Sequence, residues 1–401
     1  MAASRLLGGL ALGAALTMGA LPSQAADEIV LGFAVADSGA MNAYDSDSKK
    51  MALLWMEEQN AKGGLLGRQL KEVSADTKSD RVEGAKAGQR VLREGAVVVF
   101  ATCDYDYGAP AALQAQQAGV VSVFLCAGDP KAGVMGVGPL SFTSSNAAQV
   151  EGATLAEWGM EKKGYKTAYV LLDETLEYNK SACAGFDWRF PAVGGEIVGR
   201  DVFKGSDASI ASQITRFRSV AAEKPVDVLV LCSSMPGAPG ALRQIRAAGI
   251  DIPVFGSQSM DGLYWQDAVP GLKDFYVPIQ ASAYGDDPRP EVNELAERFE
   301  KRWGARPATQ YAFPIWAFME LWAKAVEKAG TTDAQPVVDV MNSFTDEPTL
   351  LGPRTFTPML HIQDRPLELI AEVGGGQGKV IDQWRIAEPV PQEVLYRLKT
   401  D

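Results

Sequence analysis

The sequence predicts an α/β protein of two doubly wound lobes, each a parallel sheet with helices on both faces. Three observations lead to this prediction. Strand-like and helix-like patterns alternate along nearly the whole chain, which is typical of parallel sheets with crossover helices. The alternation begins a second time near residue 144. Finally, a chain of 401 residues exceeds what one hydrophobic core usually supports and favours two domains.

The first 25 residues have the pattern of a secretory signal peptide. Arg5 supplies a positive start, residues 6–18 are mostly apolar, and Ser23-Gln24-Ala25 fits the small-residue rule for cleavage after Ala25. The apolar run is too short to cross a bilayer comfortably, and no later run reaches spanning length. We therefore expect a soluble protein exported to the periplasm, with no stable membrane insertion.

Up to about residue 143, strand-like runs alternate with helical ones. The two short apolar runs nearest the end of this part are typical of fully buried parallel strands. The strands are expected at 29–36, 69–75, 96–101 and 120–125, and the helices at 49–60, 81–93 and 109–117.

A second α/β unit of similar size follows, and then a helical part and two final strands. The second unit has strands expected at 167–172, 196–203, 227–231 and 253–255, and helices at 147–162, 179–191, 209–222 and 238–248. The later helices are expected at 290–303, 310–328 and 335–343, and the last strands at 367–373 and 379–386. No long polar linker occurs, so short segments must join the lobes, and a cleft between two such lobes is the default place for a ligand.

Charge and cysteine usage exclude several classes of partner. The chain has 38 basic and 50 acidic side chains, a net charge of −12. Such a surface repels phosphate backbones, and no nucleic acid is expected as a partner. Four cysteines, Cys103, Cys126, Cys183 and Cys232, lack any zinc spacing. Buried free thiols and one or two disulfides fit the sequence equally well. We expect neither a metal nor a cofactor.

The usual catalytic sets are missing from the sequence. His361 is the single histidine and lies in a turn near the end of the chain, so a Ser-His-Asp or Cys-His set has no candidate base. We expect His361 to be a surface residue. The sequence also contains no GxxxxGK[ST] phosphate loop and no GxSxG turn. An enzyme is therefore not indicated, and a hydrolase acting on the cleft ligand is the weakest of the functions we weigh.

Several short motifs, in order along the chain, carry a family resemblance. Residues 60–70 (NAKGGLLGRQL) look like an NxxGGxxGxxL turn, in which Gly63, Gly64 and Gly67 allow a helix end and a tight entry into the next strand. The segments SGAMNAY at 38–44, RQIRAAGI at 243–250, 310–330 and LGPRTF at 351–356 match further motifs. Together they resemble the type I periplasmic binding proteins of the Leu/Ile/Val-binding family.

The resemblance implies a solute-binding protein that carries an amino acid, amide, urea or aromatic acid to an ABC permease. It also implies three crossings between the lobes, which we place near 143–144, 278–280 and 356–357. The first lobe is then expected at 26–143 and 280–356, and the second at 144–279 and 357–401. A ligand-sensing partner of a membrane receptor, using the same lobes, is the alternative function. We expect a monomer.

The binding residues are expected in loops at the carboxyl ends of the strands. These loops are 38–47, 76–80, 103–108 and 126–129 in the first lobe, and 173–178, 232–235 and 257–261 in the second. In the amino-acid binders of the family, a Ser and an Ala-x-Thr hold the substrate carboxylate, and a Glu meets its ammonium. Carried over, the Ser falls on Asp104, the Ala-x-Thr on Cys126-Ala127-Gly128, and the Glu near Gln258 and Asp261.

A carboxylate at Asp104 departs from the family pattern. It would repel a substrate carboxylate by several kcal/mol at most, roughly, in a partly dry cleft. A neutral polar or aromatic molecule, or a cation, therefore fits better than a simple aliphatic amino acid. The ligand-binding candidates are Tyr44, Asp104, Tyr105, Cys126, Ala127, Gly128, Tyr178, Ser233, Gln258 and Asp261.

Other roles for the loop carboxylates stay open at this stage. Asp106 and Asp129 fit helix N-caps as well as they fit a binding role. Asp45 and Asp47, together with Asp104 and Asp106, have the oxygen ligands for a hard cation, although neither pair continues into a calcium-loop pattern.

Overall fold

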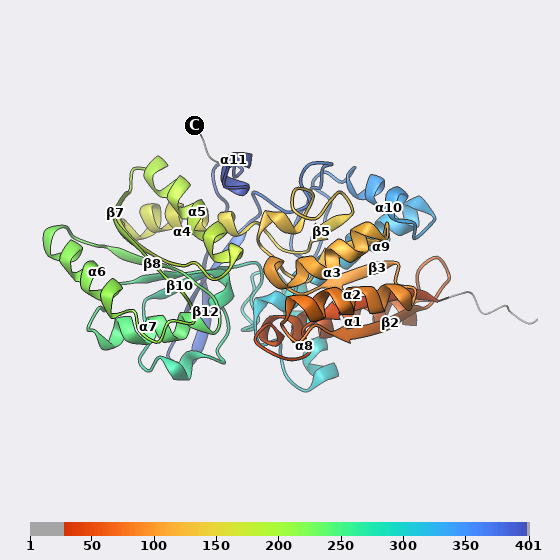
Figure 1. Cartoon of the computed structure of the whole chain (residues 1–401), viewed down its shortest axis with the longest axis horizontal. Coiled ribbons are helices and arrows are strands. Elements are labelled where there is room, and N and C mark those ends of the chain that lie inside the picture. Colours follow the sequence, from red (N-terminus) through yellow and green to blue (C-terminus); the bar gives the residue numbers. More distant parts are fainter. Residues whose placement is uncertain (1–27, 399–401) are drawn as a thin grey trace, which may run out of the picture.

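The computed structural model describes residues 28–398 and consists of two α/β lobes side by side (Figure 1). The first lobe, on the right in Figure 1, is built on a five-stranded sheet, and the second lobe, on the left, on a seven-stranded sheet. The predicted fold class is therefore confirmed. The expected signal peptide at 1–25 lies outside the described residues.

The first sheet is entirely parallel, with strand order β2-β1-β3-β4-β5. The strands are β1 (Ile29–Val35), β2 (Leu70–Asp76), β3 (Val98–Ala101), β4 (Val121–Phe124) and β5 (Ser141–Thr143). The first four were predicted. Strand β5 was not, because three residues are too few to show a period and its identity depends on pairing with β4.

Helices from two separate parts of the chain cover this sheet. They are α1 (Asn42–Ala61), α2 (Arg81–Arg93) and α3 (Tyr105–Gln117), joined by α8 (Pro290–Trp303), α9 (Pro314–Ala329) and α10 (Ala334–Met341). Figure 1 shows the late helices, in cyan and blue, returning to the same lobe as the red and orange early ones. A short 3₁₀ helix, η5 (Gln310–Ala312), precedes α9 where the sequence predicted continuous helix from residue 310.

Two helices of this lobe begin earlier than the sequence predicted. Helix α1 begins at Asn42 rather than 49, and α3 at Tyr105 rather than 109. Both first turns are polar and look like loop in the sequence. Their aspartates, however, bind backbone N–H groups: Asp45 accepts from Ala36 at 2.7 Å and from Cys103 at 2.8 Å, and Asp104 caps α3. Tyr44 and Tyr105 are therefore helical residues, and not loop residues as predicted.

The second sheet is mixed, with order β12-β11-β10-β9-β8-β6-β7. The pairs from β7 to β10 are parallel, whereas the final hairpin, β11 and β12, is antiparallel. The strands are β6 (Thr167–Asp173), β7 (Glu196–Phe203), β8 (Val228–Cys232), β9 (Val254–Gly256), β10 (Phe275–Ile279), β11 (Glu368–Gly374) and β12 (Gln377–Trp384). The hairpin's short turn requires antiparallel pairing, since a parallel pair needs a long crossover.

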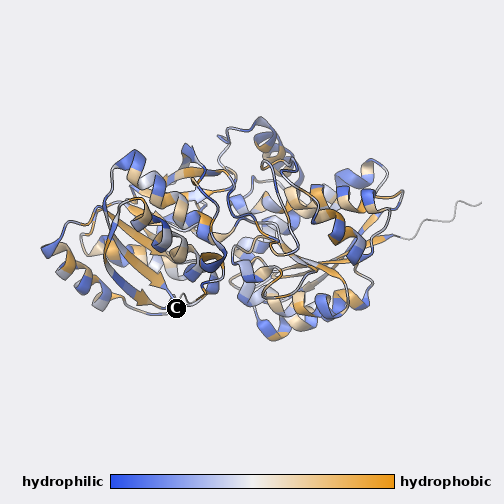
Figure 2. Cartoon of the chain, turned by 90° about the horizontal axis from the view of Figure 1, so that it is seen from above, coloured by the Kyte–Doolittle hydropathy of each residue, from blue (hydrophilic) through white to orange (hydrophobic). Residues whose placement is uncertain are grey.

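Four longer helices and one short helix complete this lobe. They are α4 (Ala148–Trp158), which continues into a π-helical turn at Gly159–Lys163, α5 (Glu177–Ala192), α6 (Ala211–Glu223), α7 (Gly237–Ala247) and α11 (Gln392–Leu395). Figure 2 shows apolar strands inside each lobe and helices of mixed polarity outside them. The largest cluster of buried apolar side chains continues from the first lobe (Phe33, Phe142) into the second (Leu231, Phe275), and a smaller cluster lies within each lobe.

His361 is buried, and the prediction that it is a surface residue was wrong. Its ring stacks on Phe142 with centroids 3.8 Å apart, and Nδ1 lies 2.8 Å from the carbonyl oxygen of Ser141. Burial lowers the pKa of His361 to about 4, so the ring is neutral at pH 7. The polar turn around His361 does not predict this contact, because the contact forms only when this late segment of the chain packs against β5.

Helices α4 and α5 approach each other closely at two glycines. A Cβ on Gly152 would lie 2.1 Å from the carbonyl oxygen of Ala182, and one on Gly185 would lie 1.8 Å from that of Gln149. Both glycines therefore let the two backbones touch. This contact positions Glu151 on α4 and Tyr178 on α5, two residues that meet below.

Gly152→Ala is expected to lower the stability of the second lobe by about 1–3 kcal/mol, because overpacking against backbone atoms forces the helices apart. The measurement is the midpoint of chemical unfolding. Gly240→Ala on α7 is the control, because nothing lies within 4 Å of a Cβ there and alanine stabilises a helix by roughly 0.5–1 kcal/mol relative to glycine. Equal midpoints for Gly152→Ala and the parent protein would contradict this account.

Candidate functional site

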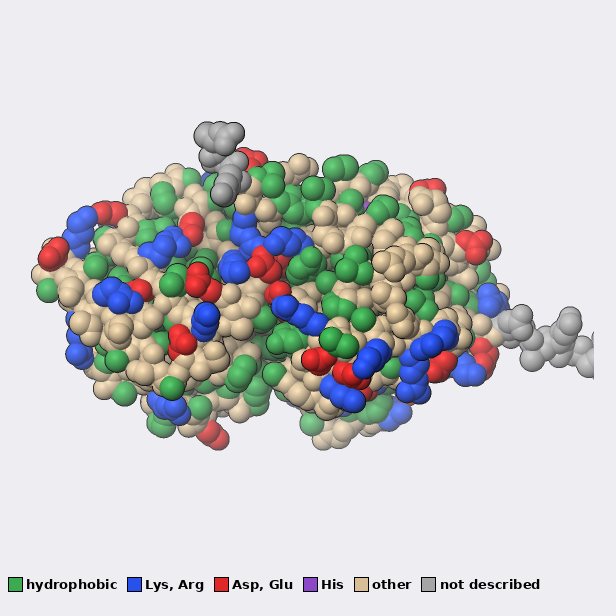
Figure 3. Space-filling model, in the orientation of Figure 1, with side chains coloured by type: hydrophobic (Ala, Val, Ile, Leu, Met, Phe, Trp, Pro, Cys, Tyr) green, Lys and Arg blue, Asp and Glu red, His purple; other side chains and the backbone are tan. Residues whose placement is uncertain are grey.

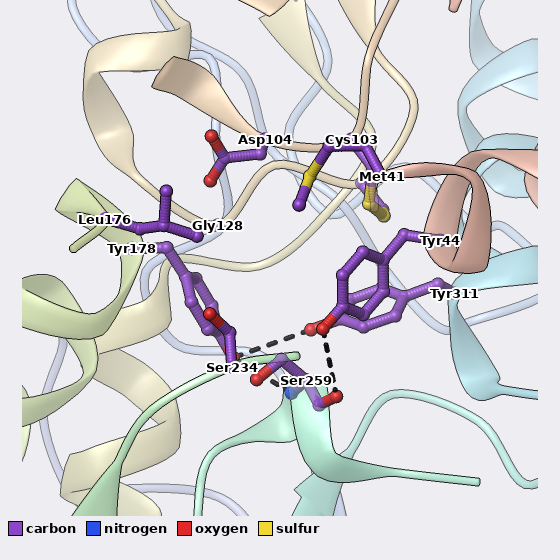
Figure 4. A pocket seen from close by; sticks show the side chains of 11 residues that line it. Met41, Tyr44, Cys103, Asp104, Gly128, Leu176, Tyr178, Ser234, Ser259 and Tyr311 are labelled. Carbon is purple, nitrogen blue, oxygen red and sulfur yellow. Dashed lines mark hydrogen bonds between the residues drawn. A yellow bond between two sulfur atoms is a disulfide. The ribbon is translucent and has the colours of Figure 1, made fainter. Parts of the chain in front are cut away.

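A cavity lies between the two lobes, and the space between its wall atoms, open solvent included, is about 310 Å³. Figure 4 shows the side chains around it, and Figure 3 shows the hollowed waist between the lobes at the lower edge of that face. The lining residues are Met41, Tyr44, Cys103, Asp104, Cys126, Gly128, Leu176, Tyr178, Ser234, Ser259 and Tyr311.

Residues just beyond the ends of parallel strands make up most of this wall. From the first lobe come Cys103 and Asp104 after β3, and Cys126 and Gly128 after β4. From the second lobe come Leu176 and Tyr178, which follow β6, Ser234 after β8 and Ser259 after β9. Parallel strands bring their carboxyl ends to one edge, and the two sheets turn these edges toward each other.

Three tyrosine rings dominate the wall, and their hydroxyls bond to the protein. Tyr44 Oη accepts from the N–H of Met235 at 3.0 Å and lies 3.5 Å from the carbonyl oxygen of Ser259. Tyr178 Oη donates to Glu151 at 2.7 Å and accepts from the N–H of Ser259 at 3.1 Å. Tyr311 Oη lies 3.5 Å from Tyr178 Oη. The tyrosines therefore present rings, rather than free hydroxyls, to the cavity (Figure 4).

Asp104 is the one ionisable carboxyl on the wall. Its side chain accepts from the N–H of Tyr107 at 3.3 Å, as the N-cap of α3, and the residue is 7% exposed. In residues 28–398, no Lys or Arg forms an ion pair with it. Burial, and then the like charge of Asp106, raises the pKa of Asp104 to about 8.

Glu151 lies beneath the tyrosines and is wholly buried. Besides the hydroxyl of Tyr178, it accepts from the N–H of Gln258 at 2.9 Å. Burial raises its pKa to about 8, opposed in part by these two hydrogen bonds. Glu368, on β11, is also fully buried, and burial raises its pKa to about 7. These two carboxyls do not line the cavity, and they take up protons near neutral pH.

Five of the ten sequence candidates line the cavity, namely Tyr44, Asp104, Cys126, Gly128 and Tyr178. Tyr105 instead packs against Phe124 with centroids 6.5 Å apart, and Ser233 donates to Asp173 at 2.9 Å. Ala127 is buried behind the wall. These three residues follow the correct strands or begin the correct helix, but they point away from the cavity.

Gln258 and Asp261 lie in the seam between the lobes rather than on the cavity wall. The side-chain oxygen of Gln258 accepts from Gln280 Nε2 at 3.1 Å. Asp261 accepts from the N–H of Gln310 at 2.7 Å and from the hydroxyl of Tyr284. Both residues thus help to join the second lobe to the segments that follow β10.

Sequence reasoning missed six lining residues, Met41, Cys103, Leu176, Ser234, Ser259 and Tyr311. Five of them fall inside loops that the sequence predicted to face the cleft, but the sequence did not single them out within those loops. Tyr311 had only one signal, since it belongs to the motif at 310–330 that was used to assign the family.

All four cysteines are in disulfides, one of the alternatives that the sequence left open. Cys103 pairs with Cys126, with Cα atoms 4.4 Å apart, and Cys183 pairs with Cys232, with Cα atoms 5.7 Å apart. The first bridge joins the ends of the neighbouring strands β3 and β4 and forms part of the cavity wall. The second joins α5 to the end of β8. Both bridges therefore brace elements that carry lining residues.

The loop aspartates do not converge on a metal site. Asp106 accepts a hydrogen bond from the N–H of Glu177 at 2.9 Å and so caps α5, which belongs to the opposite lobe. Asp129 caps a 3₁₀ turn by accepting a hydrogen bond from the N–H of Lys131. Within residues 28–398, no cluster of three His, Cys, Asp or Glu side chains has the arrangement to hold a metal ion. In the same part of the chain, no helix is long and apolar enough to cross a membrane.

Stability of the ligand-free protein is expected to fall as pH rises from about 5 to 8. Over this range the folded state keeps protons on Asp104 and Glu151 that the unfolded chain has already released, so rising pH favours unfolding by up to about 1.4 kcal/mol per pH unit and group. Thermal unfolding at several pH values measures the slope. Glu151→Gln should reduce it, whereas Glu83→Gln, on the exposed face of α2, should leave it unchanged. A flat or rising profile contradicts the prediction.

Comparison with known proteins places this fold in a family. The sequence profile of the periplasmic binding protein family matches residues 28–377. A leucine-, isoleucine-, valine-, threonine- and alanine-binding protein of Pseudomonas aeruginosa is 21% identical over 325 residues, which cover 81% of this chain and 85% of that protein.

Two solved structures share the arrangement of the lobes. One is the branched-chain amino acid transporter substrate-binding protein of Streptococcus pneumoniae in complex with isoleucine (TM-score 0.78, 20% identity, 90% of this chain and 100% of that one). The other is a solute-binding protein of Rhodopseudomonas palustris in complex with 3,4-dihydroxybenzoic acid (TM-score 0.73, 19% identity, 90% and 98%). With the profile match over most of its length, the chain belongs to the periplasmic binding protein family, whose members bind solutes and are not enzymes.

Proposed function

We propose that this protein captures a small polar or aromatic molecule between its lobes and delivers it to an ABC permease. Amino-acid-like compounds, amides, aromatic acids and alcohols are the candidate classes. The observation that carries the proposal is the cavity itself: strand-end residues of both lobes wall it, three tyrosines are among its eleven lining residues, and few polar groups face it. Concave, mostly apolar pockets with a few placed polar groups are typical of small-molecule sites.

The relatives support this range of ligands without selecting one. The Pseudomonas aeruginosa protein is named for aliphatic amino acids and threonine, and the Rhodopseudomonas palustris protein was solved with an aromatic acid. Asp104 argues against a simple aliphatic amino acid here, since a ligand carboxylate placed beside it would meet a like charge or require its proton.

Capture is proposed to occur by hinge closure. The moving bodies are 26–143 with 280–356 and 144–279 with 357–401, and the crossings lie near 143–144, 278–280 and 356–357. Several contacts that cross the cleft would break on opening, among them Tyr44 with Met235 and Asp106 with Glu177. A ligand that contacts both lobes adds free energy only to the closed form and so shifts the population toward it.

Export to the periplasm completes the proposal. The pattern at 1–25 is that of a cleaved signal peptide, and the two disulfides suit an oxidising compartment. The permease would recognise the closed pair of lobes, and the binding protein would act as a monomer.

Ligand capture is expected to raise the midpoint of thermal unfolding, because a ligand that binds only the folded state stabilises it by mass action. The measurement is thermal shift against a panel of amino acids, amides, aromatic acids, amines and alcohols, with calorimetry for each hit. A panel without any binder, together with a cavity that stays empty in crystals grown with the panel, would sink the proposal.

Gly128→Val is expected to weaken binding of any hit at least tenfold while leaving the fold intact. A Cβ at Gly128 would lie 3.3 Å from Ala148 Cβ and 3.3 Å from the Tyr178 ring, so a larger side chain holds the lobes apart. Small-angle scattering should show a more extended ligand-bound form than in the parent protein. Gly240→Ala is the control, and unchanged affinity in Gly128→Val would argue against closure over the ligand.

A further inference from the structure

The cavity contains a buried carboxyl without a counter-charge. Asp104 is 7% exposed and accepts hydrogen bonds from backbone N–H groups of its own helix, those of Asp106 and of Tyr107, the latter at 3.3 Å. No Lys or Arg occurs among the eleven lining residues, and none in residues 28–398 forms an ion pair with Asp104. Leaving water costs a buried charge much free energy, so an unpaired carboxyl keeps its proton unless a cation pairs with it. In the ligand-free protein Asp104 therefore favours its protonated form, and a ligand that brings a positive charge would favour its ionised form.

The neighbouring aspartates differ from Asp104 in this respect. Asp106 pairs with Arg81 at 3.0 Å, and Asp129 lies 3.5 Å from Arg397 and accepts from Ser181 at 2.8 Å. Each of these carboxylates has its own cation outside the cavity. Asp104 alone faces the cavity, and it alone has no cation.

The rest of the wall is suited to a positive charge. Tyr44 and Tyr311 lie edge to face with centroids 5.6 Å apart, and Tyr178 faces them across the cavity (Figure 4). Since their hydroxyls bond to protein atoms, the rings offer π-electron density instead of donors. Aromatic faces attract cations, most strongly when the charge is a poorly hydrated ammonium. Met41, Leu176 and the Cys103–Cys126 disulfide add apolar surface that suits alkyl or aryl groups.

We propose that the ligand is a small organic cation, an amine or quaternary ammonium. Its positive end lies between Asp104 and the rings of Tyr44, Tyr178 and Tyr311, and its apolar part packs against Met41, Leu176 and the Cys103–Cys126 disulfide. This inference rests on the proposed function and narrows its range of ligands. A carboxylate-bearing ligand would face Asp104 with like charge. An uncharged ligand would leave Asp104 either protonated or unpaired.

The proposal predicts a definite pH dependence of binding. With a pKa of about 8 in the ligand-free cavity, Asp104 must lose its proton to pair with a cation. The charged and titratable groups that act on it are Asp106 on its own helix, Asp129 after β4 and Tyr44 on α1, and Tyr178 on α5 shares the cavity wall. Burial keeps the pKa of both tyrosines above the ordinary value. Affinity for a cation should therefore rise from pH 6 to pH 8 and then level off.

The test compares cations with ligands of the same shape but different charge. The probes are isopentylamine against isopentyl alcohol and leucine, benzylamine against benzyl alcohol and benzoate, and choline against its uncharged carbon isostere. Calorimetry at pH 8 measures each affinity. The expected result is at least one cation that binds ten times more tightly than its uncharged and carboxylate-bearing counterparts, with affinity for that cation falling between pH 8 and pH 6.

Variants separate the role of the charge from that of the rings. Asp104→Asn keeps the helix cap but should weaken binding of the cation at least tenfold and remove its pH dependence. Asp80→Asn, an exposed N-cap of α2 outside the cavity, is the matched control and should change neither. Tyr311→Leu should weaken binding of the cation, and Tyr311→Phe, which restores a ring without the hydroxyl, should bind it at least fivefold more tightly than Tyr311→Leu.

The outcomes distinguish this inference from the proposed function. If uncharged or carboxylate-bearing probes bind as tightly as their cationic partners, or if Asp104→Asn binds the cation as well as the parent protein, the inference is overturned and solute capture stands. If no probe binds and the wider panel of solutes is also silent, the proposed function fails and the inference fails with it.

Discussion

The direction of parallel strands is the constraint on which this structure depends. In each lobe the crossover helices return the parallel strands, β1–β5 and β6–β10, in one direction, so their strand-end loops gather at one edge. The two edges face each other across the cavity. Residues 2–5 positions beyond β3, β4, β6, β8 and β9 therefore meet, although the chain separates some of them by more than a hundred residues. The cores support these loops without contributing to their chemistry.

A buried polar seam holds the two edges together beside the cavity. Tyr178 connects Glu151, Ser259 and Tyr311, so one hydroxyl joins α4, α5, the loop after β9 and the segment before α9. Because the tyrosine hydroxyls are hydrogen-bonded to protein groups in this seam, the rings rather than the hydroxyls are available to contact a solute. The two close glycine contacts between α4 and α5 set the position of Glu151 and Tyr178. Packing far from the solute thus determines which atoms the solute meets.

Charge around the cavity is arranged unevenly. Asp106 and Asp129 have arginine partners, whereas Asp104, Glu151 and Glu368 form no ion pair within residues 28–398 and have pKa values raised by burial. Desolvation is the largest cause for each of the three. Such carboxyls destabilise the ligand-free closed form near neutral pH, and a ligand that supplies the missing charge removes part of that cost. Binding and protonation are therefore coupled at this site.

The sequence by itself determined the fold class and most elements, because apolar periodicity and turn glycines are local signals. The bounds of α2, β7 and α8 agree with the residues predicted. Only the tertiary structure decided where α1 and α3 begin, that His361 is buried, how the cysteines pair and which loop residues face the cavity. Ser233, Gln258 and Asp261 turn away from it because their partners, Asp173, Gln280 and Gln310, come from other parts of the chain. Periodicity carries no information about such partners, since they meet only when the lobes pack.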